Sequence, residues 1–263
     1  MSYQRITLTV DDGIAVLTLN QPQTLNALST PLQEEMRDAL AGLRDHGDAR
    51  ALILTGAGRA FSSGADLNTM DPPQDRSLGE QVSEMMRTLS NPMIEDIRDL
   101  PIPVISAVNG PAAGAGASVA LAADLVIAAE DAYFLFPFVP TLGIVPDMGA
   151  TWHLPRLLGN ARALGLTLLG ERLPAARAAQ WGLIWAAVNG ETLMAEAQAL
   201  AARLAALPAG VAGQARRILD DAAQRGLGEQ MEEEARVQQG LIDSEAFQEG
   251  VRAFQEKRRP DFS

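Results

Sequence analysis

Two glycine-rich segments, each following a short apolar run, are the first places where this sequence could do chemistry without reactive side chains. Residues 59–67 follow the run 51–55, and residues 109–118 follow the run 104–108. Glycine lets a backbone bend so that free N–H groups point into a cavity, where such donors stabilise a developing oxyanion. Each segment also has a simpler interpretation. The first could be an ordinary turn, and the second could be close helix–strand packing through small side chains.

The second segment could also bind a dinucleotide, because Gly114 and Gly116 follow a predicted strand and precede a predicted helix. Val119 occupies the place of the third glycine in that fingerprint, and an incomplete fingerprint is a weak signal. A nicotinamide-binding oxidoreductase is therefore a remote alternative. From these residues alone, an oxyanion donor and a packing role both remain open.

One carboxylate lies in a loop suited to acid–base work: Asp147, in the run Val145-Pro146-Asp147-Met148-Gly149. This run is also typical of a turn, and aspartate is a favoured cap for the helix that follows. If Asp147 faces a cavity, Val145, Pro146 and Met148 should desolvate it and raise its pKa above about 3.9. It would then be a better base near neutral pH.

The composition excludes several other kinds of site. The chain has no cysteine, and only His46 and His153 could offer imidazole, so we expect no metal site. A net charge of −12 argues against a nucleic-acid surface. The N-terminus shows no signal region, and glycines interrupt the most apolar stretch, residues 112–129. We therefore expect a soluble cytoplasmic protein with no membrane partner.

Hydrophobic patterning predicts a β/α body followed by helices. Alternating runs at 6–10 and 14–19 predict a hairpin. Thr30 as N-cap, with Gln33 closing a capping box, predicts a helix to about His46. The further predicted elements are a strand at 51–55, a mobile surface loop at 68–79, a helix to about 100, strands at 103–108, 125–128, 132–134 and 185–188, a helix ending near 123, and helices from 148 onward.

Taken in order, these segments resemble those of the crotonase (enoyl-CoA hydratase/isomerase) family. The resemblance covers essentially the whole chain. Within the family, residues 163–185 most resemble the ring-epoxide isomerases of phenylacetate degradation. The segments that carry the family resemblance are Asn20 to Leu28, Phe61 to Leu67, Val108 to Asp124, Leu142 to Asp147, Leu154 to Gly159 and Glu249 to Arg258.

The resemblance implies an α/β fold in which a ββα spiral, residues 1–195, precedes a helical trimerisation section, residues 196–263. It implies self-association as a trimer or a dimer of trimers. The substrate would be an acyl-CoA thioester, so that coenzyme A is part of the substrate and no cofactor is tightly bound. The N–H groups of Ala65 and Ala115 would bind the thioester carbonyl. The residues expected to contact coenzyme A are Arg59, Ala60, Ala65, Asp66, Leu67, Phe254 and Lys257.

The resemblance also bears on the reaction. The two glutamates with which hydratases of this family activate water map to Ser118 and Val139, and neither side chain is an acid or base near neutral pH. Asp147 matches the catalytic carboxylate of the family's isomerases. We therefore predict an isomerase in which the oxyanion hole holds an enolate and Asp147 moves the proton. A hydratase is the alternative, and a non-catalytic CoA-binding homologue is a remote one.

Two smaller expectations complete this interpretation. Ser118 should bond to the backbone of its own helix. The acyl group should meet apolar side chains, for which the candidates are Leu67, Met70, Met85, Phe136 and Phe138.

Overall fold

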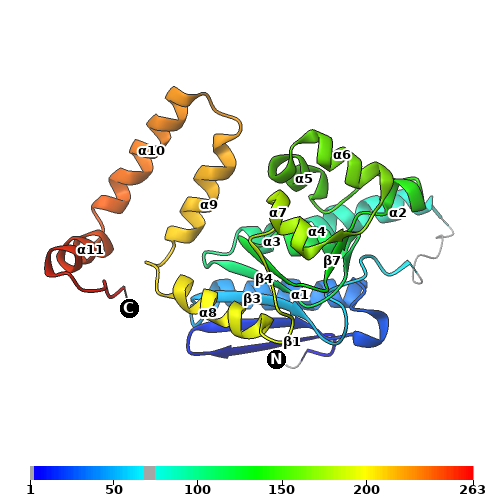
Figure 1. Ribbon diagram of the computed structural model, residues 1–263, viewed down its shortest axis with the longest axis horizontal. Helices are drawn as coiled ribbons and strands as arrows, with labels where there is room; N and C mark the ends of the chain where they lie inside the picture. Colours follow the sequence, from blue (N-terminus) through cyan, green and yellow to red (C-terminus); the bar gives the residue numbers. More distant parts are fainter. Residues whose placement is uncertain (1–2, 68–74, 263) are drawn as a thin grey trace.

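A six-stranded sheet lies at the centre of the computed structural model, which describes residues 3–67 and 75–262 (Figure 1). The strand order is β1-β2-β3-β4-β6-β9, in which β1 and β2 form the predicted antiparallel hairpin and the remaining pairs are parallel. The strands are β1 (Ile6–Asp11), β2 (Ile14–Leu19), β3 (Ala51–Gly56), β4 (Val104–Val108), β6 (Leu125–Ala129) and β9 (Ala186–Val188).

A second sheet joins three short strands, β5 (Ala112–Ala113), β7 (Tyr133–Leu135) and β8 (Leu173–Pro174). The sequence predicted only β7 of these three. β5 and β8 are two residues long, too short to show an alternating pattern. β5 lies inside the second glycine-rich segment, and its pairing with β7 helps to hold that segment in place.

Helices pack around the sheets, and most begin and end near their predicted limits. A π-helical turn at Met86–Ser90 joins α2 to α3 into one nearly continuous helical stretch. The helices of the body are α1 (Thr30–His46), α2 (Leu78–Met85), α3 (Asn91–Arg98), α4 (Ala115–Leu121), α5 (Ala150–Leu158), α6 (Asn160–Leu169), α7 (Ala175–Trp181) and α8 (Leu193–Ala205).

The predicted cap of α1 is wrong. The N-cap is Ser29 rather than Thr30, and its side chain makes no capping hydrogen bond. Gln33 does not reach back to the N-cap, because its side chain turns inward and donates to the carbonyl oxygen of Leu28 at 3.0 Å. A true capping box opens α2 instead, between Ser77 and Glu80.

The predicted surface loop at 68–79 lies for the most part outside the described residues. Its predicted end is too late, since α2 already begins at Leu78.

The core lies between the six-stranded sheet and the helices on its two faces. All six residues of β3 and all five of β4 are buried, as expected for central parallel strands covered on both sides. α8 packs against β2, β3, β4 and β6, and it spans the predicted boundary between residues 195 and 196. The division of the chain at that boundary stays a prediction.

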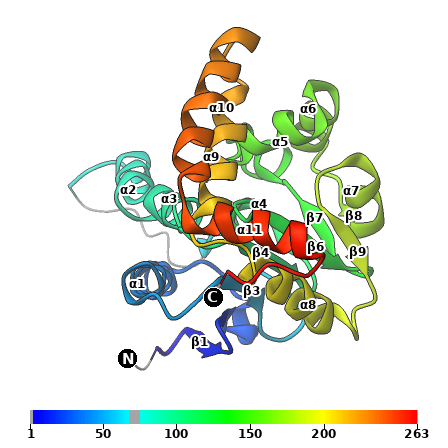
Figure 2. The ribbon, with the colours of Figure 1, turned by 90° about the vertical axis from the view of Figure 1, so that its left-hand side faces the viewer.

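The three C-terminal helices extend from the body as an arm (Figures 1 and 2). They are α9 (Val211–Ala222), α10 (Leu227–Ile242) and α11 (Glu245–Glu256). None of them buries a large apolar side chain. Their exposed apolar side chains are Leu219, Leu227, Met231, Ile242, Phe247, Val251 and Phe254.

One arginine ties the base of this arm to the body. Arg216 of α9 pairs with Asp124 through two N–O contacts of 2.5 and 2.7 Å. It also donates to the carbonyl oxygen of Arg98, and to those of Leu100 at 2.9 Å and Ile102 at 3.2 Å. Its side chain is only 9% exposed, so these bonds are shielded from water.

We expect Arg216→Met to lower the free energy of unfolding by about 3 kcal/mol, because it leaves Asp124 and three carbonyls without their shielded partner. Arg217→Met, one residue along on the exposed side of α9, should change stability by less than about 0.5 kcal/mol. Urea unfolding of both variants measures the difference. Equal effects would show that Arg216 does not anchor the arm.

Candidate active site

The two glycine-rich segments are hydrogen-bonded directly to each other. The N–H groups of Phe61 and Ser62 donate to the carbonyl of Pro111 at 3.1 and 3.2 Å, and the N–H of Ala113 donates to the carbonyl of Ser62 at 2.9 Å. An isolated parallel bridge pairs Ser62 with Ala112. The segments that follow the carboxyl ends of the neighbouring strands β3 and β4 are therefore joined to each other by backbone hydrogen bonds.

Two glycines make this contact close enough. Gly64 has φ +94°, and a Cβ atom there would lie 2.7 Å from the carbonyl oxygen of Ala113 and 3.2 Å from the amide nitrogen of Ala115. A Cβ atom on Gly116 would lie 2.6 Å from the Cβ of Ser62. Real Cβ atoms are essentially never found closer than 3.0 Å to such a neighbour. The absence of side chains at these two positions therefore sets the spacing between the segments.

Ala65 and Ala115, the two predicted backbone donors, line one cavity of about 610 Å³. Ala115 is the first residue of α4, so its N–H has no acceptor within the helix. Among the described residues, neither N–H group has a hydrogen-bond acceptor. The structure thus places two residues with unused N–H donors at the same cavity.

Asp147 reaches this cavity from a sharp turn before α5. Met148 at φ +48° and Gly149 at φ +84° reverse the chain immediately after it. Asp147 lines the cavity, and its Oδ1 atom is buried without a hydrogen-bond partner among the described residues. The N-cap of α5 is Gly149, and no side chain caps this helix. The interpretation of Asp147 as a helix cap is therefore wrong.

Burial raises the pKa of Asp147 from its ordinary value of 3.8 to about 6, although its own backbone N–H partly offsets the shift. Met148 is buried beside it and lines the cavity, and Pro146 is also buried. Val145 is 74% exposed, so the expectation that it desolvates Asp147 is wrong. The predicted direction of the pKa shift is confirmed.

Ser118 supports the turn that carries Asp147. Its hydroxyl donates to the carbonyl oxygen of Asp147 at 3.0 Å, an oxygen that also accepts from the N–H of Ala150 at 3.0 Å. The expectation that Ser118 bonds to its own helix is wrong, because the turn lies close enough to compete for the hydroxyl. Ser118 therefore links α4, which begins at Ala115, to the turn that presents the carboxyl group.

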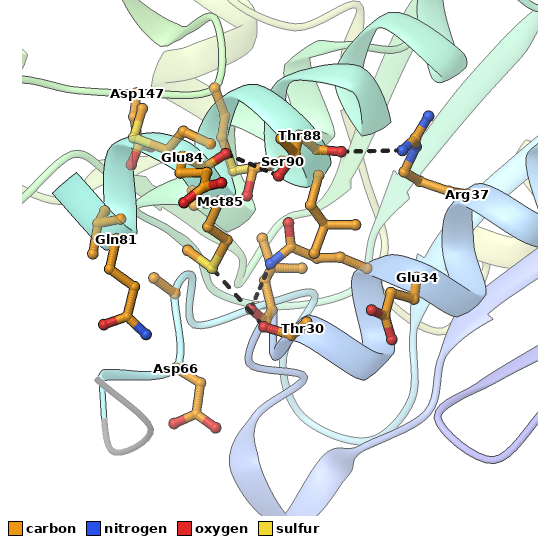
Figure 3. A pocket seen from close by; sticks show the side chains of 18 of the residues that line it. Thr30, Glu34, Arg37, Asp66, Gln81, Glu84, Met85, Thr88, Ser90 and Asp147 are labelled. Atoms are coloured by element: carbon orange, nitrogen blue, oxygen red, sulfur yellow. Dashed lines mark hydrogen bonds between the residues drawn. The ribbon is translucent and has the colours of Figure 1, made fainter. Parts of the chain in front are cut away.

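The rest of the cavity is formed mainly by α1, α2 and the π-helical turn (Figure 3). Figure 3 shows Asp147 on one side of the view and Glu34 and Arg37 on the other. Besides Ala65, Ala115, Asp147 and Met148, the lining residues are Leu28, Thr30, Gln33, Glu34, Arg37, Asp66, Arg76, Leu78, Gln81, Val82, Glu84, Met85, Met86, Thr88, Leu89 and Ser90.

The predicted apolar pocket is largely different from this one. Met85 lines the cavity as expected, but Phe136 and Phe138 are buried in the core, and Leu67 is 52% exposed at the surface. Met70 lies outside the described residues. The sequence had drawn attention to Gln33 only as part of a helix cap, and it gave no signal for Gln81 or Ser90. Only the packing of α1 against α3 and the π-helical turn, which continues α2, brings these polar residues to one space.

The residues predicted to contact coenzyme A do not all lie at the cavity. Ala65 and Asp66 line it, whereas Arg59 is exposed outside it. Ala60 is buried, and its carbonyl accepts from the side-chain amide of Asn26 at 2.8 Å. Leu67, as noted, is exposed without lining the cavity.

Phe254 and Lys257 are far from this cavity in the same chain. They lie on or just after α11, at the opposite end of the long axis from α2 (Figure 1). Phe254 is 85% exposed. The structure therefore does not bring these two residues to the cavity within one chain.

His153 is a buried residue of α5 and does not line this cavity. Burial lowers its pKa to about 4, with further contributions from Arg98 and Arg156. Within the described part of the chain, no three His, Cys, Asp or Glu side chains are grouped to hold a metal ion. No described helix is both long and apolar enough to cross a membrane.

Comparison with known proteins gives one consistent result. Residues 9–263 match the family model described as enoyl-CoA hydratase/isomerase. A protein of Rhodobacter capsulatus named a probable enoyl-CoA hydratase is 42% identical over 100% of this chain and 99% of its own length. The 1,2-epoxyphenylacetyl-CoA isomerase of Escherichia coli is also 42% identical, over 97% of this chain and 96% of its own.

Solved structures agree with the sequence comparison. The enoyl-CoA hydratase of Bacillus anthracis superposes with a TM-score of 0.90 at 33% identity, covering 98% of this chain and 99% of that one. The predicted fold class is confirmed by this likeness.

We expect Gly64→Ala to lower the free energy of unfolding by about 2 kcal/mol, because the methyl group collides with Ala113 and φ +94° is strained for alanine. Gly42→Ala is the matched control, since a Cβ atom there meets nothing within 4 Å in the middle of α1. That change should stabilise the helix by about 0.5 to 1 kcal/mol. Thermal unfolding of both variants tests the contact. A Gly64→Ala variant as stable as the wild-type protein would contradict it.

The raised pKa of Asp147 predicts that the free energy of unfolding depends on pH. The folded state holds the proton up to about pH 6 and the unfolded state only to about pH 3.8, so stability should fall as pH rises between these values. The ionised group then costs about 3 kcal/mol above pH 6. Asp147→Asn should remove this dependence. Unfolding free energies at pH 4 and pH 8 check it, and a variant that keeps the full wild-type slope would disprove the assignment.

Proposed function

The chain belongs to the enoyl-CoA hydratase/isomerase family, and on that premise we propose that it is an isomerase of enoyl-CoA-type thioesters with Asp147 as its base. The observation that carries this proposal is the buried, unpartnered carboxyl oxygen of Asp147 at the cavity that Ala65 and Ala115 also line. Three other carboxylates line the cavity: Glu34 and Glu84 are exposed, and Asp66 is half-buried. Glu84 also pairs with Arg76.

In the proposed mechanism, the thioester carbonyl accepts hydrogen bonds from the N–H groups of Ala65 and Ala115. Each such donor contributes roughly 3 kcal/mol to stabilising the enolate that forms when a proton leaves C2. Asp147 takes this proton and returns it to C4 of a 3-enoyl thioester, so the double bond moves from C3–C4 to C2–C3. One carboxyl group suffices because no proton is gained or lost overall.

Isomerisation of a ring epoxide is the second form of this proposal. The Escherichia coli relative named 1,2-epoxyphenylacetyl-CoA isomerase matches nearly the whole chain, which supports such a substrate. An enolate held at the same two N–H groups would be common to both reactions.

A hydratase is the alternative, and the name of the Rhodobacter capsulatus relative favours it. Water addition needs a second group to activate the water or to protonate the neighbouring carbon. The hydroxyl of Ser118 is already donated to a backbone carbonyl, and Val139 is not among the residues that line the cavity. These two observations support the isomerase over the hydratase.

We also propose that the coenzyme A moiety is held in part by a neighbouring copy of the chain. Phe254 and Lys257 lie at the far end of the arm, so they could contact a coenzyme A only when the arm meets another copy's body. The exposed apolar side chains along α9, α10 and α11 would be buried in such a trimer or dimer of trimers.

A paired absorbance assay on 3-hexenoyl-CoA and crotonyl-CoA tests the reaction type. We expect conversion of the first to its 2-enoyl isomer without hydration of the second, with kcat/KM rising as pH passes about 6 and Asp147 ionises. Asp147→Asn should lower kcat by about 10²- to 10⁴-fold, whereas the exposed control Asp131→Asn should not. Brisk hydration of crotonyl-CoA, or full activity of Asp147→Asn, would contradict the proposal.

A further inference from the structure

Gln33 holds an unpaired hydrogen-bond acceptor in the wall of the cavity. The residue lies in the first turn of α1, lines the cavity and is only 3% exposed. Its amide nitrogen donates to the carbonyl oxygen of Leu28 at 3.0 Å. Its amide oxygen, Oε1, is buried without a hydrogen-bond partner among the described residues.

The orientation of this amide follows from chemistry. A carbonyl oxygen can only accept a hydrogen bond, so the nitrogen of Gln33 must face Leu28 and the oxygen must face away. Leu28 is itself held, because its N–H donates to the carbonyl of Gly64 at 2.8 Å and it forms a bridge with Ala65. The acceptor on Gln33 is thus fixed to the same framework as the N–H group of Ala65.

The acceptor is not isolated in this cavity. Gln81 also has a buried Oε1 atom with no partner in the described part of the chain, and Ser90, 4% exposed, lines the same space. Buried polar atoms without partners are rare in folded proteins, because each forfeits its bonds to water. Two unpaired amide acceptors on residues that line one cavity are the pattern expected where a ligand supplies the donors. A purely hydrocarbon acyl chain would leave both unsatisfied.

We propose that the cavity accepts a thioester whose acyl group carries a hydroxyl, with Oε1 of Gln33 accepting the hydroxyl proton. This inference rests on the proposed function, since it takes the cavity as the acyl site. Gln33 then acts as a specificity-determining residue. A site built to hydrogen-bond a hydroxyl discriminates strongly against the analogue that lacks it, because its own buried acceptor is left unpaired.

Calorimetric binding of saturated thioesters tests the inference without needing turnover. The probes are hexanoyl-CoA against 6-hydroxyhexanoyl-CoA and octanoyl-CoA against 8-hydroxyoctanoyl-CoA, so that two depths of the cavity are sampled. We expect the hydroxylated member of at least one pair to bind the wild-type protein about tenfold more tightly. Equal or weaker binding of both hydroxylated members would overturn the inference, whether or not any variant folds.

Gln33→Met separates recognition from a merely structural role. Its side chain has nearly the same length but no acceptor, so the preference for the hydroxylated probe should vanish or reverse. A structural role would weaken both members of a pair equally and leave their ratio unchanged, which would also overturn the inference. Ser106→Ala is the matched control: Ser106 has a buried, unpartnered hydroxyl in β4, away from the cavity, and the ratio should stay at its wild-type value.

The outcomes also separate this inference from the proposed function. If neither member of either pair binds, the cavity is not an acyl-thioester site, and both proposals fall. If both members bind alike and 3-hexenoyl-CoA is still isomerised, the proposed function stands and only the role of Gln33 is rejected. In that case the acceptor is satisfied by water.

Discussion

The close contact between the two glycine-rich segments is the constraint on which the candidate site depends. Gly64 and Gly116 lie where a Cβ atom would collide with the opposite segment, and backbone hydrogen bonds join the segments on either side of these contacts. The strands that precede the segments, β3 and β4, are adjacent, parallel and buried. The sheet therefore sets where the segments begin, and the missing side chains set how closely they approach. As a consequence, two residues whose N–H groups have no acceptor among the described residues line one cavity.

Asp147 illustrates how a group suited to catalysis is kept at a cost to stability. Its turn uses a non-glycine residue at positive φ, and its carboxyl group is buried with one oxygen unpartnered. Both features are unfavourable for folding in isolation. The turn is held by Ser118 and by the first N–H of α5, which bind its carbonyl oxygen from two helices. A residue that only capped the start of α5 would need neither the burial nor this support.

The same cavity is lined by a buried polar side chain that the sequence had suggested would cap a helix. Gln33 has the spacing of a capping residue, yet its amide nitrogen donates to Leu28 and the buried residue lines the cavity. Phe136 and Phe138 have the character of acyl-pocket residues, yet they belong to the core. The cavity is consequently lined by more polar side chains than the predicted acyl pocket, whose candidate residues were all apolar. The arm of α9, α10 and α11 shows the reverse, since it leaves apolar side chains uncovered.

Local patterning was sufficient for most of the fold, because strand alternation, helical periodicity and glycine positions are properties of neighbouring residues. The hairpin of β1 and β2, the helix over Thr30–His46 and the family resemblance over the whole chain all follow from the sequence alone. So do Asp147, Ala65 and Ala115 as candidates. Only the tertiary structure decided that Ser118 binds the Asp147 turn, that Gln33 faces the cavity and that Val145 does not. Burial and partner choice depend on residues far apart in the chain, and only packing brings those residues together.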